Sequence, residues 1–182
     1  MKRSGESINT EERKYLPEIV LGGIDGSITT FAVVSGVVGA SLNASIVLIM
    51  GFANLLADGF SMAVSDYFSV KSRSENVKTY VNTKKNKTPI QSGFVTFLAF
   101  ILIGFIPLLS FVLSLITENS FLTANQFLIS AILTGISFFV VGFFRGDVLG
   151  KDRIRSSLEV LLIGGIASVL AFLAGRLLQI VL

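Results

Sequence analysis

The 182-residue chain contains no cysteine, no histidine and no tryptophan. The absence of cysteine and histidine excludes disulfides, zinc fingers, iron–sulfur clusters, cysteine nucleophiles and the Ser-His-Asp triad. Proton chemistry near neutral pH therefore falls to carboxylates, lysine or tyrosine. No spacing in the chain resembles a hydrolase, kinase or intramembrane protease site. We expect a protein that is not an enzyme and that needs no cofactor.

Charge is also scarce. Charged residues make up 15% of the chain, hydrophobic residues make up 52%, and the mean hydropathy is +0.76. A soluble domain of this size carries about 25% charged residues, so the composition is that of a membrane protein. A net charge of +3 would hint at nucleic acid in a soluble chain. Here we expect contacts with anionic lipids and no nucleic-acid partner.

Long apolar runs fill most of the chain. Five of them are long enough to cross a hydrocarbon core of about 30 Å, and they cover residues 18–40, 44–68, 92–116, 123–145 and 157–182. They do not alternate in polarity as membrane strands do. The sequence predicts an all-α, polytopic membrane protein with a polar tail (1–17) and one five-helix domain (18–182). Pro107 lies inside the third span and predicts a kink there.

Basic residues gather on one side of these spans. All 15 lysines and arginines except Arg176 lie before the first span, between the second and third, or between the fourth and fifth. The positive-inside rule then places the N-terminus in the cytoplasm and the C-terminus outside. Five spans cannot be divided into two inverted halves, so a homodimer would have to supply any symmetry of a pathway.

Acidic side chains inside the spans are costly unless they are paired, hydrated or ligated. Asp25 lies in the first span and Asp58 in the second, and no basic residue occurs at their depth. A functional role is therefore the favoured interpretation of both. Glu18, Asp66 and Glu159 lie nearer the ends of their spans, where capping or pairing with lysine or arginine is the simpler interpretation.

The second span carries a stripe of side chains at four-residue spacing, which forms one slowly drifting helix face. Its members are Met50, Asn54, Asp58, Met62 and Asp66. Hard oxygen together with soft sulfur suits a first-row divalent cation such as Fe²⁺ or Mn²⁺. Methionine at helical spacing is more often packing, and that alternative stays open for Met50 and Met62. Counted from the span ends, Asp25, Asp58 and Met62 lie at similar depths.

Small residues also recur at four-residue spacing. Such pairs occur in three spans, as Gly22 with Gly26, Ala53 with Ala57, and Ala171 with Gly175. This spacing lets helix backbones approach closely. It predicts that the helices associate, without saying for what purpose.

Two sequence blocks, IDGSITTFAVVSG in the first span and ANLLADGFSMAVSDY in the second, closely resemble the vacuolar iron transporter family. That family includes the yeast calcium-cross-complementer proteins and plant nodulin-like relatives. The final span, RSSLEVLLIGGIASVLAFLAGRLL, also looks like the family's fifth, so the resemblance covers essentially the whole chain. It implies a homodimer of five-helix subunits that moves Fe²⁺, and often Mn²⁺, out of the cytosol in exchange for protons. The implied pathway lies at the dimer interface, between the first two helices of each subunit.

The resemblance also implies site residues. The family's acid in the DG motif falls on Asp25, and its methionine in the SM motif falls on Met62. Many eukaryotic members carry a glutamate two turns before that methionine, where this chain has Asn54; here the carboxylate is Asp58, one turn before it. The expected metal ligands are therefore Asp25, Asp58, Met62 and Asn54, with Glu18 and Asp66 as proton-coupling or cytoplasmic-entrance groups.

One departure from the family concerns the interval between the second and third spans. Well-studied members insert a glutamate-rich metal-binding domain there, whereas residues 71–91 of this chain are basic with the single acid Glu75. We expect metal capture to rest on Glu18, Asp66 and the membrane site. A transport-inactive regulatory subunit, or an exporter of another small cation, is the alternative. The expected location is a prokaryotic plasma membrane, or a vacuolar membrane in a eukaryote.

Overall fold

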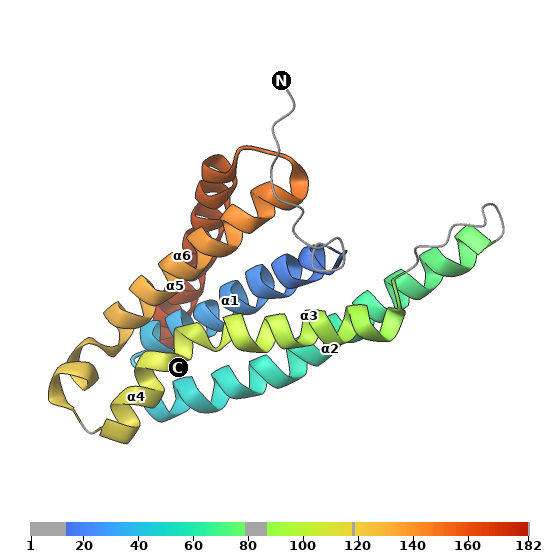
Figure 1. Cartoon of the computed structure of the whole chain (residues 1–182). Helices are drawn as coiled ribbons and strands as arrows, with labels where there is room; N and C mark the ends of the chain where they lie inside the picture. The colour runs from blue at the N-terminus through green and yellow to red at the C-terminus, as the bar shows by residue number, and fades with distance from the viewer. Residues whose placement is uncertain (1–13, 79–86, 118, 182) are drawn as a thin grey trace.

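A computed structural model describes residues 14–78, 87–117 and 119–181. The described chain is helical and has no strand, and five of its helical segments are long and apolar enough to cross a membrane. The predicted all-α class is confirmed. The helices are α1 (Leu16–Gly39), α2 (Ala44–Lys78), α3 (Pro89–Gly104), α4 (Leu109–Thr117), α5 (Ser120–Leu149) and α6 (Arg153–Val181), with a 3₁₀ turn at Ile106–Leu108 (Figure 1).

Helix α1 lies in the middle of the bundle. It contacts α2 and α3 on one side and α5 and α6 on the other, as Figure 1 shows. Basic residues of the described chain gather at one end of the bundle, which we call the basic end: Lys14 before α1, Lys71 and Arg73 near the end of α2, Lys87 before α3, and Lys151, Arg153 and Arg155 at the turn between α5 and α6. Arg176 belongs to the last turns of α6, where its guanidinium donates to Gln179.

Glycines bring α1 into backbone contact with α3. A Cβ atom added at Gly22 would lie 2.5 Å from the carbonyl oxygen of Thr96, and one at Gly26 would lie 2.5 Å from that of Phe100. The predicted close approach at the Gly22–Gly26 pair is thus confirmed. Helices α1 and α6 approach in the same way, because a Cβ added at Gly175 would clash with the carbonyl oxygen of Gly36.

We expect Gly26→Ala to destabilise the protein by about 1–3 kcal/mol, because the added methyl group meets α3 backbone that cannot move locally. Gly165→Ala is the matched control, since no heavy atom lies within 4 Å of its added Cβ. Thermal unfolding of the two variants in the same detergent measures the difference. Equal midpoints would show that α1 and α3 separate at little cost.

Pro107 breaks the third span, as predicted. Helix α3 ends at Gly104, a 3₁₀ turn contains Pro107, and α4 continues from Leu109. Proline has no N–H and cannot continue the α-helical hydrogen bonding. The hydroxyl of Ser130 on α5 donates to the Pro107 carbonyl oxygen at 2.6 Å, which ties the break to the neighbouring helix.

Helix α2 continues well past residue 68, where its apolar run ends. Its 35 residues correspond to a length of about 52 Å, against a hydrocarbon core of about 30 Å. The far end of α2 projects beyond its neighbours in Figure 1. Lys71 and Arg73, expected in the connection between the second and third spans, therefore lie on an extension of the helix.

Candidate functional site

Asp25 on α1 and Asp58 on α2 form a pair of carboxylates in the first two helices. Both are half-buried, and they lie close enough for their negative charges to repel. Within the described residues, no hydrogen bond or ion pair satisfies either carboxylate. Unpaired carboxylates inside an apolar span are costly. Their expected role as metal ligands stays a prediction.

A cavity of about 560 Å³ opens beside Asp25, between α1, α5 and α6. Apolar side chains such as Ile24 and Ile163 form most of its wall. Arg145 also lines it, but its guanidinium is bonded to Glu159 at 3.0 Å. A water molecule takes about 30 Å³, so the cavity has room for a hydrated divalent cation next to the Asp25 carboxylate.

The stripe on α2 divides into different environments. The Asn54 side-chain amide donates to the hydroxyls of Thr29 (3.3 Å) and Thr30 (3.5 Å) on α1. Met62 packs against the apolar core, while Asp66 turns towards α3. Four-residue spacing drifts by about 40° per step on an α-helix, so the ends of the stripe point in different directions.

One chain does not complete a metal site from acidic side chains. Across residues 14–78, 87–117 and 119–181, no group of three or more histidine, cysteine, aspartate or glutamate side chains could hold a metal ion. First-row divalent cations take four to six ligands, and Asp25 with Asp58 supplies two side chains. The remaining ligands would have to come from neutral groups, water or a second copy.

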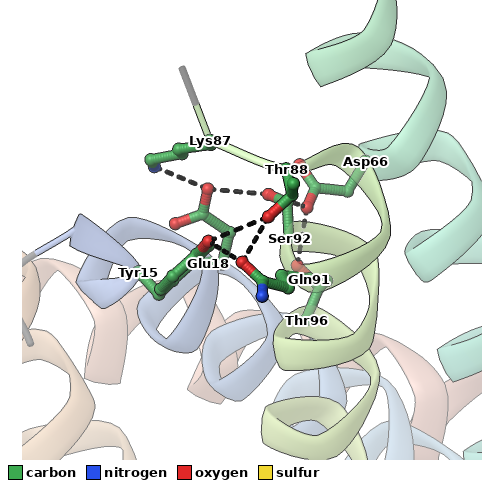
Figure 2. Close-up of polar contacts among 8 residues, drawn as sticks. All are labelled: Tyr15, Glu18, Asp66, Lys87, Thr88, Gln91, Ser92 and Thr96. Carbon is green, nitrogen blue, oxygen red and sulfur yellow. Dashed lines mark hydrogen bonds and ion pairs between the residues drawn. The ribbon is translucent and has the colours of Figure 1, made fainter. Parts of the chain in front are cut away.

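A second pair of acids lies at the basic end and is shown in Figure 2. Glu18 is 5% exposed, and its Oε1 atom lies 2.8 Å from the Ser92 hydroxyl. The same hydroxyl lies 2.8 Å from Oδ2 of Asp66, which also accepts from Thr96 at 3.0 Å. Two turns of α1, about 10 Å, separate Glu18 from Asp25. The acids therefore form two pairs at different levels along α1 and α2, Glu18 with Asp66 nearer the basic end and Asp25 with Asp58 further from it.

Pairing with basic residues is confirmed for two of the three acids near span ends. Lys87 lies 2.6 Å from Glu18, and Arg145 lies 3.0 Å from Glu159. Asp66 instead has the hydroxyl partners of α3. Its expected role, like that of Glu18, in proton coupling or at the entrance stays a prediction.

Sequence reasoning missed Ser92, Thr96 and Lys87. The two hydroxyls lie in a span without acids, and their partners are 26 or more residues away along the chain. Their four-residue spacing at the start of the third span, at the depth of Glu18 and Asp66, was the available signal.

Similarity to known proteins covers nearly the whole of this architecture. The model of the VIT family matches residues 16–88 and 76–176. The chain belongs to the VIT family. It is 28% identical to the vacuolar iron transporter of Toxoplasma gondii, over 92% of this chain and 75% of the relative. It is 30% identical to the vacuolar iron transporter homolog 4 of Arabidopsis thaliana, over 86% of this chain and 79% of the relative.

The alignments also show a length difference within the VIT family. The alignment with the Toxoplasma protein runs over 227 positions, more than the 182 residues of this chain, whereas that with the Arabidopsis protein runs over 165. The family model matches in two pieces that overlap at residues 76–88, from the end of α2 to the residue before α3. The alignment with the Toxoplasma protein therefore includes residues that this VIT-family chain lacks. That these residues form a domain between the second and third spans stays a prediction.

Proposed function

We propose that this VIT-family protein exports a divalent transition metal, Fe²⁺ or Mn²⁺, from the cytosol in exchange for protons. The observation that carries the proposal is the unpartnered pair of Asp25 and Asp58 in the first two helices. Curated relatives named vacuolar iron transporter support the substrate class. The proposed ligands are Asp25, Asp58 and Met62, with the amide oxygen of Asn54.

A homodimer would complete this site. Ala53 and Ala57 on α2 are exposed, and small residues at this spacing let a second helix approach closely. Two copies meeting there would bring together two Asp25–Asp58 pairs and two Met62 thioethers. The combined set offers both hard oxygen and soft sulfur, which suits Fe²⁺ and Mn²⁺.

Exchange follows from competition for the same oxygens. A metal ion binds the ionised carboxylates, and protons arriving from the other side of the membrane release it. With the basic end in the cytoplasm, metal would enter past Glu18 and Asp66 and then reach Asp25 and Asp58. The protons would travel in the opposite direction.

Flux into liposomes tests the proposal. The purified protein is reconstituted, Fe²⁺ or Mn²⁺ is added outside, and trapped metal is counted after the external metal is chelated. An interior more acidic than the exterior should accelerate uptake, because outgoing protons drive incoming metal. Protein-free liposomes are the control. Uptake that does not depend on the pH gradient would contradict exchange with protons. Inhibition of metal uptake by simple amines would indicate another cation as the substrate.

The second candidate is a transport-inactive regulatory subunit. The short interval between α2 and α3 favours it, because the chain lacks the extra residues of its longer relatives. Absence of flux at every pH gradient, from a folded protein, would support it. The location in a prokaryotic plasma membrane stays a prediction, since the relatives above are named for the vacuole.

A further inference from the structure

Lys87 places a positive charge on the buried acid at the basic end. Its ammonium nitrogen lies 2.6 Å from Oε1 of Glu18, whose side chain is 6% exposed. The Lys87 side chain is itself 30% exposed, and it approaches from the segment just before α3, as Figure 2 shows. Lysine is a compact charge on a flexible stem. It can therefore leave Glu18 without any helix moving.

The Ser92 hydroxyl lies between the two carboxylates and cannot satisfy both. It has one proton to donate, yet it lies 2.8 Å from Glu18 Oε1 and 2.8 Å from Asp66 Oδ2. Only one carboxylate can accept that proton at a time. At any moment, therefore, one of the two carboxylate oxygens beside Ser92 receives no hydrogen bond from it.

Glu18 also has an oxygen without any partner. Its Oε2 atom is buried and accepts no hydrogen bond from the described residues. A buried carboxylate oxygen without a donor is costly, and a cation is the most effective group to satisfy it. Together with the single Ser92 proton, this leaves the Glu18–Asp66 pair with more negative charge than Lys87 alone neutralises.

We propose that Lys87 is a tethered cation at the entrance of the pathway, and that an incoming divalent metal ion displaces its ammonium from Glu18. The inference rests on the proposed function, because it assumes that metal enters at the basic end. A divalent ion bound between Glu18 and Asp66 would neutralise both carboxylates and find hard oxygen ligands in Ser92 and Thr96. Lys87 thereby sets the metal concentration at which the entrance fills.

The test measures Mn²⁺ binding to the full chain through the spectroscopic signal of free Mn²⁺. Asp25→Asn and Asp58→Asn are both present, so that the deeper site does not contribute. In this background, Lys87→Gln should tighten binding about tenfold, because the competing charge is removed. Lys87→Arg keeps the charge and should bind Mn²⁺ like its parent. Glu18→Gln added to Lys87→Gln should abolish the gain.

Lys71→Gln is the matched control. It removes one positive charge from the same end of the bundle, where the Lys71 ammonium lies over the ring of Tyr67. Equal tightening by Lys71→Gln and Lys87→Gln would overturn the inference, since general charge would then explain both. Unchanged binding in Lys87→Gln would overturn it as well.

The two hypotheses fail separately. If the unmodified chain transports metal but Lys87→Gln binds Mn²⁺ no more tightly, the role of Lys87 is rejected and the transport function stands. If the unmodified chain transports no metal but Lys87→Gln binds Mn²⁺ more tightly in a way that needs Glu18, the transport function is rejected. A cation site for which Lys87 competes then stands.

Discussion

Asp25→Asn should reduce metal flux by more than about 100-fold, because even groups that only orient metal ligands cost 10–100-fold when they are changed. The substitution keeps the size of the side chain and removes the charge that binds the metal. Thermal stability should change little, since no described residue bonds or pairs with the Asp25 carboxylate. Flux into liposomes and the unfolding midpoint are measured on the same preparation.

Asp147→Asn is the matched control for this substitution. Asp147 lies near the end of α5 and pairs with Arg153 at the surface, away from the proposed pathway. Its flux should equal that of the unmodified chain. If Asp25→Asn transports metal at the rate of this control, the carboxylate is not a ligand and the site assignment is wrong.

Ala57→Trp should separate the proposed dimer and lower flux by at least about tenfold. A bulky ring on a small-residue face prevents the close approach that such helix contacts need. The side chain is exposed in the single chain, so the fold itself should tolerate the change. Mass measurement in detergent reports the number of copies, and liposome flux reports activity.

Ala174→Trp serves as the control, because Ala174 is also exposed but lies on α6. The absence of cysteine makes a second readout simple. Ala57→Cys should crosslink to its counterpart in membranes, and Ala174→Cys should not. A dimer that survives Ala57→Trp with full flux would mean that the copies meet on another face.

Hydropathy was sufficient to predict the number of spans, because the energetic cost of polar backbone in lipid leaves long apolar helices as the solution. The break at Pro107 was also predictable, since it follows from a missing N–H. The end of α2 was not predictable in this way. Hydropathy marks where the apolar stretch ends, whereas the helix continues through polar residues to Lys78.

The candidate metal site was also partly predictable from the cost of placing polar groups in lipid. Asp25 and Asp58 stand out because charge is expensive in lipid, and the structure brings them near each other. The contacts of Ser92 could not be derived from one sequence, because its partners Glu18 and Asp66 come from two other helices. A serine hydroxyl carries no charge, so its position in the sequence gives no signal of a site before the packing of those helices is known.

The glycine contacts have a mechanical consequence. α1 touches the backbone of α3 at Gly26 and that of α6 at Gly175, and α2 meets α3 backbone-to-backbone where Gly93 faces Ala63. Helices in such contact cannot slide past one another without a clash, so these four behave as one rigid body. In the proposed dimer, the pathway would then open to either side of the membrane by a rigid-body rotation of one copy relative to the other.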